Sequence, residues 1–194
     1  MISRKPKTLK AQPFLQGPRL DLRPLVIADA REPYLSWLND PEVCEGNSHH
    51  LFPYTAEAAV DFIRRVNVAS RELVLAIIER ASVRHIGNIA LQKIHPVNRS
   101  AELALIIGEK DAWGKGYGAE AARLVCAHGF TQLNLHRIAC GTFATNTAMQ
   151  KLALSLGMKK EGRRRSAAFK NGRYLDVIEY GLLRVEFKQF GKIS

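Results

Sequence analysis

The sequence is poor in cysteine and contains no long apolar run. Only three cysteines occur among its 194 residues, and Cys44, Cys126 and Cys140 stand far apart without a CxxC pair. This spacing argues against a disulfide framework or a metal-binding cluster, so no metal is expected, and it suits a reducing cytoplasm. No apolar stretch reaches the roughly 18 residues that a membrane-spanning helix needs, so no membrane partner is expected. The N-terminus also lacks the apolar core of a secretory signal.

Acidic side chains are also scarce. The chain has 18 Asp and Glu against 29 Lys and Arg, which gives a formal net charge of +11. Such a balance favours anionic partners, namely nucleic acid, the ribosome or a phosphorylated ligand. The basic residues gather in the first 23 positions and again over 159–165. No helix-turn-helix, zinc-finger or RNP-type pattern accompanies them, so a solvated basic surface is favoured over a nucleic-acid site.

Hydrophobic periodicity predicts a single domain over 18–194 that follows a flexible basic tail over 1–17. Strands are expected over 19–25, 71–80, 86–94, 101–107, 136–143, 158–169 and 173–184, and helices over 29–40, 55–70, 115–132 and 146–157. The three strands over 71–107 have short links, which favours an antiparallel meander. The strand–helix–strand order over 101–143 makes its two strands parallel or splayed neighbours. Asn171-Gly172 is the strongest hairpin signal in the chain.

The stretch AELALIIGEKDAWGKGYGA over 101–119 is the part of the chain best suited to hold phosphate. An apolar strand runs into a glycine-rich loop, and that loop opens directly into a helix. Glycine lets the backbone approach an anion, and the unpaired N–H groups and dipole at a helix N-terminus favour negative charge. Lys115 is not followed by Ser or Thr, which excludes the Walker pattern, and Gly114, Gly116 and Gly118 do not fit the dinucleotide fingerprint. For the loop alone, a tight structural turn is the alternative.

The order of these elements and their motifs resembles the GNAT superfamily of acetyl-CoA-dependent N-acetyltransferases, and most closely its RimJ/RimL-like branch. The resemblance covers about residues 19–185 and is carried by AELALIIGEKDAWGKGYGAEA, LNLHRIACGTFATNTAMQKLALSLGMKKEG, the FKNGRYLD hairpin and LRPL…YLSWLNDPEV. It implies an α/β fold of the α+β type. In that fold a mixed, mostly antiparallel central sheet of about seven strands is splayed at the cofactor site and flanked by about four helices.

The resemblance also implies a site for acetyl-CoA. The pantetheine arm would lie where the strands over 103–107 and 137–143 diverge, paired with the backbone of Ile106, Ile107 and Gly108. The pyrophosphate would lie against the loop formed by Trp113, Gly114, Lys115, Gly116, Tyr117, Gly118 and Ala119. Asn146 would contact the arm besides capping its helix, and Lys151 would reach the ribose phosphate. Many relatives have Gln or Arg where Trp113 stands, so one cation is missing there and Lys115 is expected to compensate.

Acetyl transfer to an amine requires removal of a proton, and Glu102 at the start of the central strand is the first candidate for the general base. His49 and His50, in an irregular loop over 42–54, are the alternatives, because imidazole titrates near neutrality. If these residues are not catalytic, Glu102 is an exposed glutamate at a strand end, and His49 and His50 belong to a packed loop.

The acid that usually protonates the departing thiolate is absent. Many relatives carry a tyrosine seven residues after the asparagine, and Ala153 occupies that position here. A backbone N–H near Gly108 is expected to polarise the thioester carbonyl.

The sequence therefore predicts an enzyme that moves acetyl from acetyl-CoA to a primary amine by direct transfer in a ternary complex. The expected acceptor is a nucleotide-linked amino sugar or the N-terminus of a ribosomal-type protein. A polyamine or an aminoglycoside fits the net positive charge less well. The alternative function is a basic RNA- or ribosome-associated binding module with the same fold and no turnover. A monomer or a homodimer, with or without ribosome association, is compatible with these interpretations.

Overall fold

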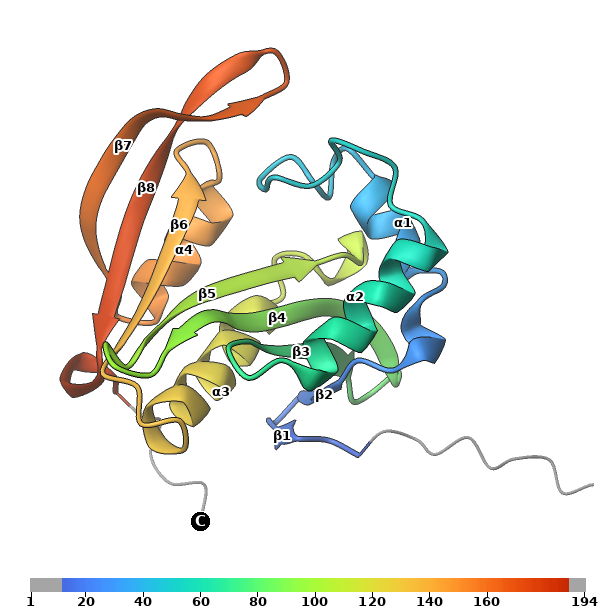
Figure 1. Cartoon of the computed structure of the whole chain (residues 1–194), viewed down its shortest axis with the longest axis horizontal. Coiled ribbons are helices and arrows are strands. Elements are labelled where there is room, and N and C mark those ends of the chain that lie inside the picture. The colour runs from blue at the N-terminus through green and yellow to red at the C-terminus, as the bar shows by residue number, and fades with distance from the viewer. Residues whose placement is uncertain (1–11, 189–194) are drawn as a thin grey trace, which may run out of the picture.

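One eight-stranded mixed sheet runs through the molecule, and helices cover both of its faces (Figure 1). The computed structural model describes residues 12–188. The strands are β1 (Leu15–Gln16), β2 (Leu20–Pro24), β3 (Leu73–Glu79), β4 (Arg84–His95), β5 (Ser100–Ile107), β6 (Arg137–Phe143), β7 (Lys159–Lys170) and β8 (Arg173–Leu183). They lie in the order β1-β2-β3-β4-β5-β6-β8-β7, and only the β5–β6 pair is parallel. The expected mixed, mostly antiparallel sheet is confirmed.

The helices are α1 (Tyr34–Asn39), α2 (Ala56–Val68), α3 (Tyr117–Thr131) and α4 (Thr147–Ser155), with short 3-10 turns η1 (Ile27–Asp29), η2 (Lys110–Ala112) and η3 (Arg184–Glu186). Strand alternation divides the core between the two faces of the sheet. In β3, Leu75 and Ile77 pack into the cluster that contains α3, whereas Val74 and Ala76 pack with residues of α2. Within residues 12–188, none of these helices is long and apolar enough to cross a membrane.

The two central strands separate after a short parallel contact (Figure 1). β5 and β6 pair over only three positions, the last of which joins Glu102 to Ala139. β4 stays paired with β5 as far as Ile107, and β8 stays paired with β6 as far as Phe143. The sheet is thus continuous on either side of a gap that opens in its middle, which confirms the predicted splay.

The last two strands form the predicted hairpin. β7 and β8 are joined by Asn171 and Gly172, whose φ angles of +50° and +77° are those of a two-residue turn of the expected type. The hairpin projects beyond the end of β6, toward the loop over 42–54 (Figure 1). The Nζ of Lys170 at its tip donates to the carbonyl of His49 across 2.7 Å. Hairpin and loop therefore meet above one face of the sheet.

The helix expected over 29–40 is wrong in its first half. The chain forms only the turn η1 there, and α1 begins directly after Pro33. Proline lacks the N–H that a helix interior needs, so it suits a helix start. Asp29 therefore does not cap a long helix, and its carboxylate instead pairs with both terminal nitrogens of Arg23 at 2.7 Å.

Of the tail expected over 1–17, residues 1–11 lie outside the described part of the structure. In the described part, Leu15–Gln16 forms β1 against β2, and the N–H of Phe14 donates to the carbonyl of Leu22 across 2.7 Å. The expected domain start at residue 18 is therefore too late, and β1 is the reason that the sheet has eight strands rather than about seven.

Candidate active site

The free edge of β5 faces the gap between the two central strands. The N–H of Gly108 donates to the carbonyl of Ile86 in β4 across 2.9 Å. Because backbone groups alternate along an antiparallel strand, Ile106 also points to β4, whereas Leu105 and Ile107 point into the gap. The N–H of Gly108 itself is used within the sheet, so the backbone N–H expected near Gly108 to polarise the thioester carbonyl would be that of Ile107, and this role stays a prediction. Leu105, which sequence reasoning did not name, also lies along this free edge.

The glycine loop shows why its glycines are needed. Gly114 and Gly116 have φ angles of +72° and +81°, and Gly116 is the N-cap of α3. A Cβ on Gly118 would lie 3.1 Å from Cδ1 of Leu105 and 3.2 Å from Cδ1 of Leu152. Glycine at this position therefore lets the first turn of α3 lie close against β5 and α4.

The other predicted loop residues have different surroundings. Lys115 is exposed, and Ala119 is half-buried in the first turn of α3. The indole N–H of Trp113 donates to the carbonyl of Ile107 across 2.8 Å, which ties the loop back to the end of β5. Trp113 thus fixes the loop and uses one acceptor of the free edge, leaving the N–H of Ile107 facing the gap.

An arginine far away in the sequence supports the loop from the β2 side. The Nη1 of Arg19 donates to the carbonyl of Lys115 across 2.9 Å, and its Nε donates to Glu120 across 2.8 Å. The guanidinium lies over the ring of Tyr117, 4.8 Å from its centroid. Sequence reasoning missed this role, because no local pattern connects β2 with the start of α3.

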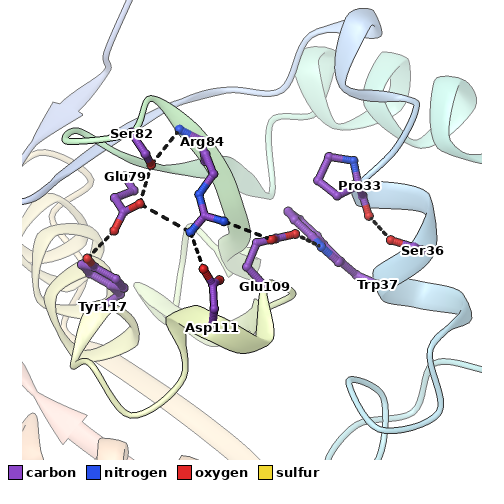
Figure 2. A network of polar contacts seen from close by, with 9 residues as sticks. All are labelled: Pro33, Ser36, Trp37, Glu79, Ser82, Arg84, Glu109, Asp111 and Tyr117. Carbon is purple, nitrogen blue, oxygen red and sulfur yellow. Dashed lines mark hydrogen bonds and ion pairs between the residues drawn. The ribbon is translucent and has the colours of Figure 1, made fainter.

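A chain of polar contacts connects the loop with α1, as Figure 2 shows. The chain runs, in order, through Tyr117, Glu79, Arg84, Glu109 and Trp37. Arg84 also pairs with Asp111 across 2.9 Å. The hydrogen bond to Glu79 raises the pKa of Tyr117 and keeps its hydroxyl directed at that carboxylate. Tyr117 thus serves to anchor the loop.

Asn146 joins the start of α4 to the loop over 42–54. Its Oδ1 accepts from the N–H of Met149 at 3.0 Å, which confirms the predicted helix cap. Its Nδ2 donates to the carbonyl of Gly46, also at 3.0 Å. Lys151 is exposed on the same helix, whereas Ala153 is fully buried in the core. The cofactor contacts expected of Asn146 and Lys151 stay predictions.

A cavity of about 460 Å³ lies where β5 and β6 begin to separate. It is lined by Ser48, Lys93, Glu102, Ala139, Gly141, Thr142, Phe143, Arg164, Ala167, Ala168, Val177 and Glu179. Two carboxylates face it, each with a basic partner. Glu102 pairs with Lys93 at 2.8 Å, and Glu179 pairs with Arg164 at 2.7 Å. The cavity therefore contains two ion pairs, one from β5 and one from β8, with the small residues Ala139 and Gly141 of β6 between them.

Glu179 lines the cavity although no sequence motif indicated it as a site residue. It lies opposite Gly141 in the β6–β8 ladder, and a Cβ on Gly141 would come within 3.1 Å of its carboxylate. Glycine at that position leaves room for the carboxylate to lie across β6. Finding this relationship requires the pairing of β6 with β8, which no local signal provides.

The two histidines lie beside the cavity rather than along its wall. Ser48 is the loop residue that lines it, whereas His49 and His50 are exposed. Partial desolvation of the ring, together with the positive charge of Lys170, lowers the pKa of His49. Among the predicted bases, the described residues bring only Glu102 to the cavity.

The acetyltransferase (GNAT) domain model matches residues 19–159 of the chain. The chain is 34% identical over 173 residues to the uncharacterized N-acetyltransferase p20 of Bacillus licheniformis, covering 87% of this chain and 95% of that protein. It is 32% identical over 111 residues to the spermidine N(1)-acetyltransferase of Vibrio cholerae, covering 57% and 64%. A solved spermidine N-acetyltransferase from Vibrio cholerae, in complex with CoA and spermine, has a TM-score of 0.78 at 25% identity, covering 88% of this chain and 98% of that one.

Proposed function

Because the chain belongs to the GNAT acetyltransferase family, we propose that it transfers acetyl from acetyl-CoA directly to a primary amine held in the cavity beside Glu102. One observation carries the proposal. Glu102 and Ala139 are the last paired residues of β5 and β6, and both line the cavity. The free edge of β5 begins at the next residue. An acyl donor lying along that edge and an amine in the cavity would therefore meet at this point.

The chain's own residues fit acetyl-CoA. The backbone groups of Leu105 and the N–H of Ile107 face the gap and suit an extended pantetheine arm, which carries amide donors and acceptors. Gly118 leaves open a space next to Leu105 and Leu152 that a Cβ would fill. The N–H groups at the start of α3 suit a pyrophosphate. Acetyl-CoA supplies the thioester with its thiolate leaving group, and the exposed Lys115 and Lys151 add cations for its phosphates.

Glu102 holds the proton that the reaction releases. A primary amine is protonated at neutral pH and must lose that proton before its lone pair can attack. In the transfer, a bond forms between the amine nitrogen and the acetyl carbon, and the bond from that carbon to sulfur breaks. The ammonium proton passes to the Glu102 carboxylate, directly or through water, and the second proton that the nitrogen loses as the carbon–sulfur bond breaks passes to the departing thiolate. The buried Ala153 supplies none.

The acceptor that we propose is a nucleotide-linked amino sugar or the N-terminus of a ribosomal-type protein, in the cytoplasm. A polyamine, the acceptor class of the spermidine acetyltransferase relatives, suits this cavity less well. Each of its two carboxylates is already paired with a cation, and the chain has a net charge of +11. A binding module without turnover rests on Ala153 alone, and no contact of the described residues favours it.

The test is release of free CoA thiol from acetyl-CoA, measured with a nucleotide-linked 4-amino sugar, peptides that begin with Ala or Ser, spermidine and an aminoglycoside. Release with the amino sugar or a peptide is the expected result. Release with spermidine alone would contradict the proposed acceptor, and failure to bind acetyl-CoA in calorimetry would contradict the proposed function.

A further inference from the structure

A second cavity lies next to the first on the same side of the sheet. It has a volume of about 340 Å³ and is lined by Arg65, Arg71, Glu72, Gln92 and Lys93. Lys93 lines both cavities, so the two spaces adjoin at this side chain. Three of the five lining residues are cations and only one is an anion. The lining of the second cavity therefore carries a net charge of +2 with Lys93 included, and of +1 when Lys93 is counted with its partner Glu102 in the first cavity.

Strand register fixes the distance between the two cavities. Gln92 of β4 lies opposite Glu102 of β5, which in turn lies opposite Ala139 of β6. Residues directly opposite one another project from the same face of a sheet. Neighbouring strands lie about 4.8 Å apart, so Gln92 on β4 and Ala139 on β6, which are two strands apart, are separated by roughly 10 Å.

Lys93 is held in an unusual conformation that places it between the cavities. Its φ angle is +51°, and it sits where the β4–β5 register shifts between Gln92 and His95. A bulge of this kind changes the direction of a side chain that would otherwise alternate to the opposite face. As a result, Lys93 reaches Glu102, with its Nζ 2.8 Å from the carboxylate. Strain at a non-glycine residue beside a candidate site suggests a functional role.

The two arginines of the second cavity differ in what holds them. The guanidinium of Arg65 lies over the ring of Phe62, 5.3 Å from its centroid, and pairs with Glu72. Arg65 is thus preoriented. Arg71 is exposed just before β3, and its backbone carbonyl accepts from the N–H of Ile94 at 2.9 Å. Its backbone is therefore fixed while its side chain faces solvent at the cavity.

We propose that this second cavity is a phosphate subsite for the acceptor, formed by Arg71, Arg65 and Lys93. This inference rests on the proposed function. It assigns the acceptor to amines that also carry a phosphate group roughly 10 Å away, and so favours a nucleotide-linked amino sugar over a protein N-terminus. When the ammonium group of the acceptor approaches Glu102, Lys93 turns from that carboxylate to the phosphate. Glu102 is thereby released to take the amine's proton.

Calorimetry on the full chain saturated with CoA tests the subsite without requiring turnover, and the CoA keeps phosphate probes away from the glycine loop. The probes are a UDP-linked 4-amino sugar and the methyl glycoside of the same sugar, which lacks phosphate. We expect the UDP-linked sugar to bind at least about tenfold more tightly, the effect of one charge-assisted contact. Inorganic pyrophosphate should compete with it, which separates phosphate recognition from recognition of the nucleobase.

Arg71→Gln should remove most of this preference while leaving the affinity for the methyl glycoside unchanged. Arg64→Gln is the matched control, because Arg64 is an exposed arginine of α2 that pairs with Asp61 and does not line the cavity. Equal binding of the two sugars, or a preference that survives Arg71→Gln, would overturn the subsite. Phosphate-dependent binding without acetyl transfer would instead contradict the proposed function and leave the subsite standing.

Discussion

The Nε of Arg19 donates to Oε2 of Glu120 across 2.8 Å, although 101 positions separate the two residues in the chain. The other carboxylate oxygen accepts from the backbone N–H groups of Arg19 and Leu20. One carboxylate therefore satisfies the start of β2 and fixes the first turn of α3. Because Arg19 also reaches the carbonyl of Lys115, the position of the glycine loop depends on this contact between distant segments.

Removal of that carboxylate should destabilise the fold. Glu120→Ala leaves the two N–H groups and the guanidinium without their acceptor, and the Glu120 side chain is only 13% exposed. We expect a loss of about 2 kcal/mol in the free energy of unfolding, measured by urea denaturation. Glu57→Ala is the control, because it removes an exposed first-turn acid from α2 and should cost much less. Equal losses for the two variants would mean that the contact with Arg19 contributes nothing.

The approach of α3 to β5 can be tested at Gly118. Gly118→Val would place methyl groups against Leu105 and Leu152 and so push the first turn of α3 away from the β5 edge. We expect the dissociation constant for acetyl-CoA to rise at least about tenfold, because both the loop and the edge are displaced. Gly162→Val in β7 is the matched control, because a Cβ there meets nothing within 4 Å and should leave binding unchanged. Unaltered acetyl-CoA affinity in Gly118→Val would remove the loop as the pyrophosphate site.

The sheet could be predicted in large part because its signals are local. Apolar runs marked the strands, and Asn171-Gly172 fixed the last hairpin. The helix predicted over 29–40 is longer than α1. The apolar spacing continues across Pro33, whereas helical backbone hydrogen bonding does not. The sheet's gap was expected from the family resemblance. Its free edge was assigned to Ile106, Ile107 and Gly108, of which only Ile107 has backbone groups that face the gap.

The site residues that sequence reasoning missed all depend on pairing between distant segments. Glu179 reaches the cavity because β8 pairs with β6 and Gly141 leaves it room. Lys93 reaches Glu102 because of a bulge in β4, and no periodicity predicts which residue a bulge will turn. Arg19 contacts the glycine loop only once β2 and α3 are packed together. Glu102 was named from the family resemblance at a place on one strand, and the structure brings it to the cavity, whereas its role as base stays a prediction.

Stability should fall as the solution becomes mildly acidic, and His85 should account for part of the loss. Burial lowers the pKa of His85, although its hydrogen bond with Asn88 and the charge of Asp29 act in the opposite direction. The unfolded chain therefore takes up a proton below about pH 6.5 that the folded chain resists, so this contribution is present above that pH and lost below it.

Urea denaturation at pH 7 and pH 5 measures this loss. We expect His85→Gln to lose less stability between the two values than the unsubstituted protein does, by on the order of 1 kcal/mol. His95→Gln, which removes an exposed histidine of β4 instead, is the comparison variant. If His85→Gln shows the full loss, other groups are responsible for it.

The role of Glu102 as the base predicts a change in the pH profile. Glu102→Gln keeps the shape of the side chain but cannot take the amine's proton. The rate should therefore fall on the order of 100-fold at neutral pH. At pH 9 to 10 a larger share of the acceptor is already neutral, so the deficit should shrink. The measurement is kcat/KM for CoA thiol release between pH 6 and pH 10 with an acceptor found in the panel.

Glu179→Gln is the matched comparison, because Glu179 faces the same cavity from β8 and is also paired with a cation. A carboxylate that only positions the acceptor should raise KM when it is replaced, without changing the shape of the pH profile. Glu102→Gln should instead lower kcat in a pH-dependent way. If both variants keep the original profile, neither carboxylate removes the proton. If the pH dependence changes only in Glu179→Gln, the base belongs to β8 rather than to the end of the β5–β6 contact.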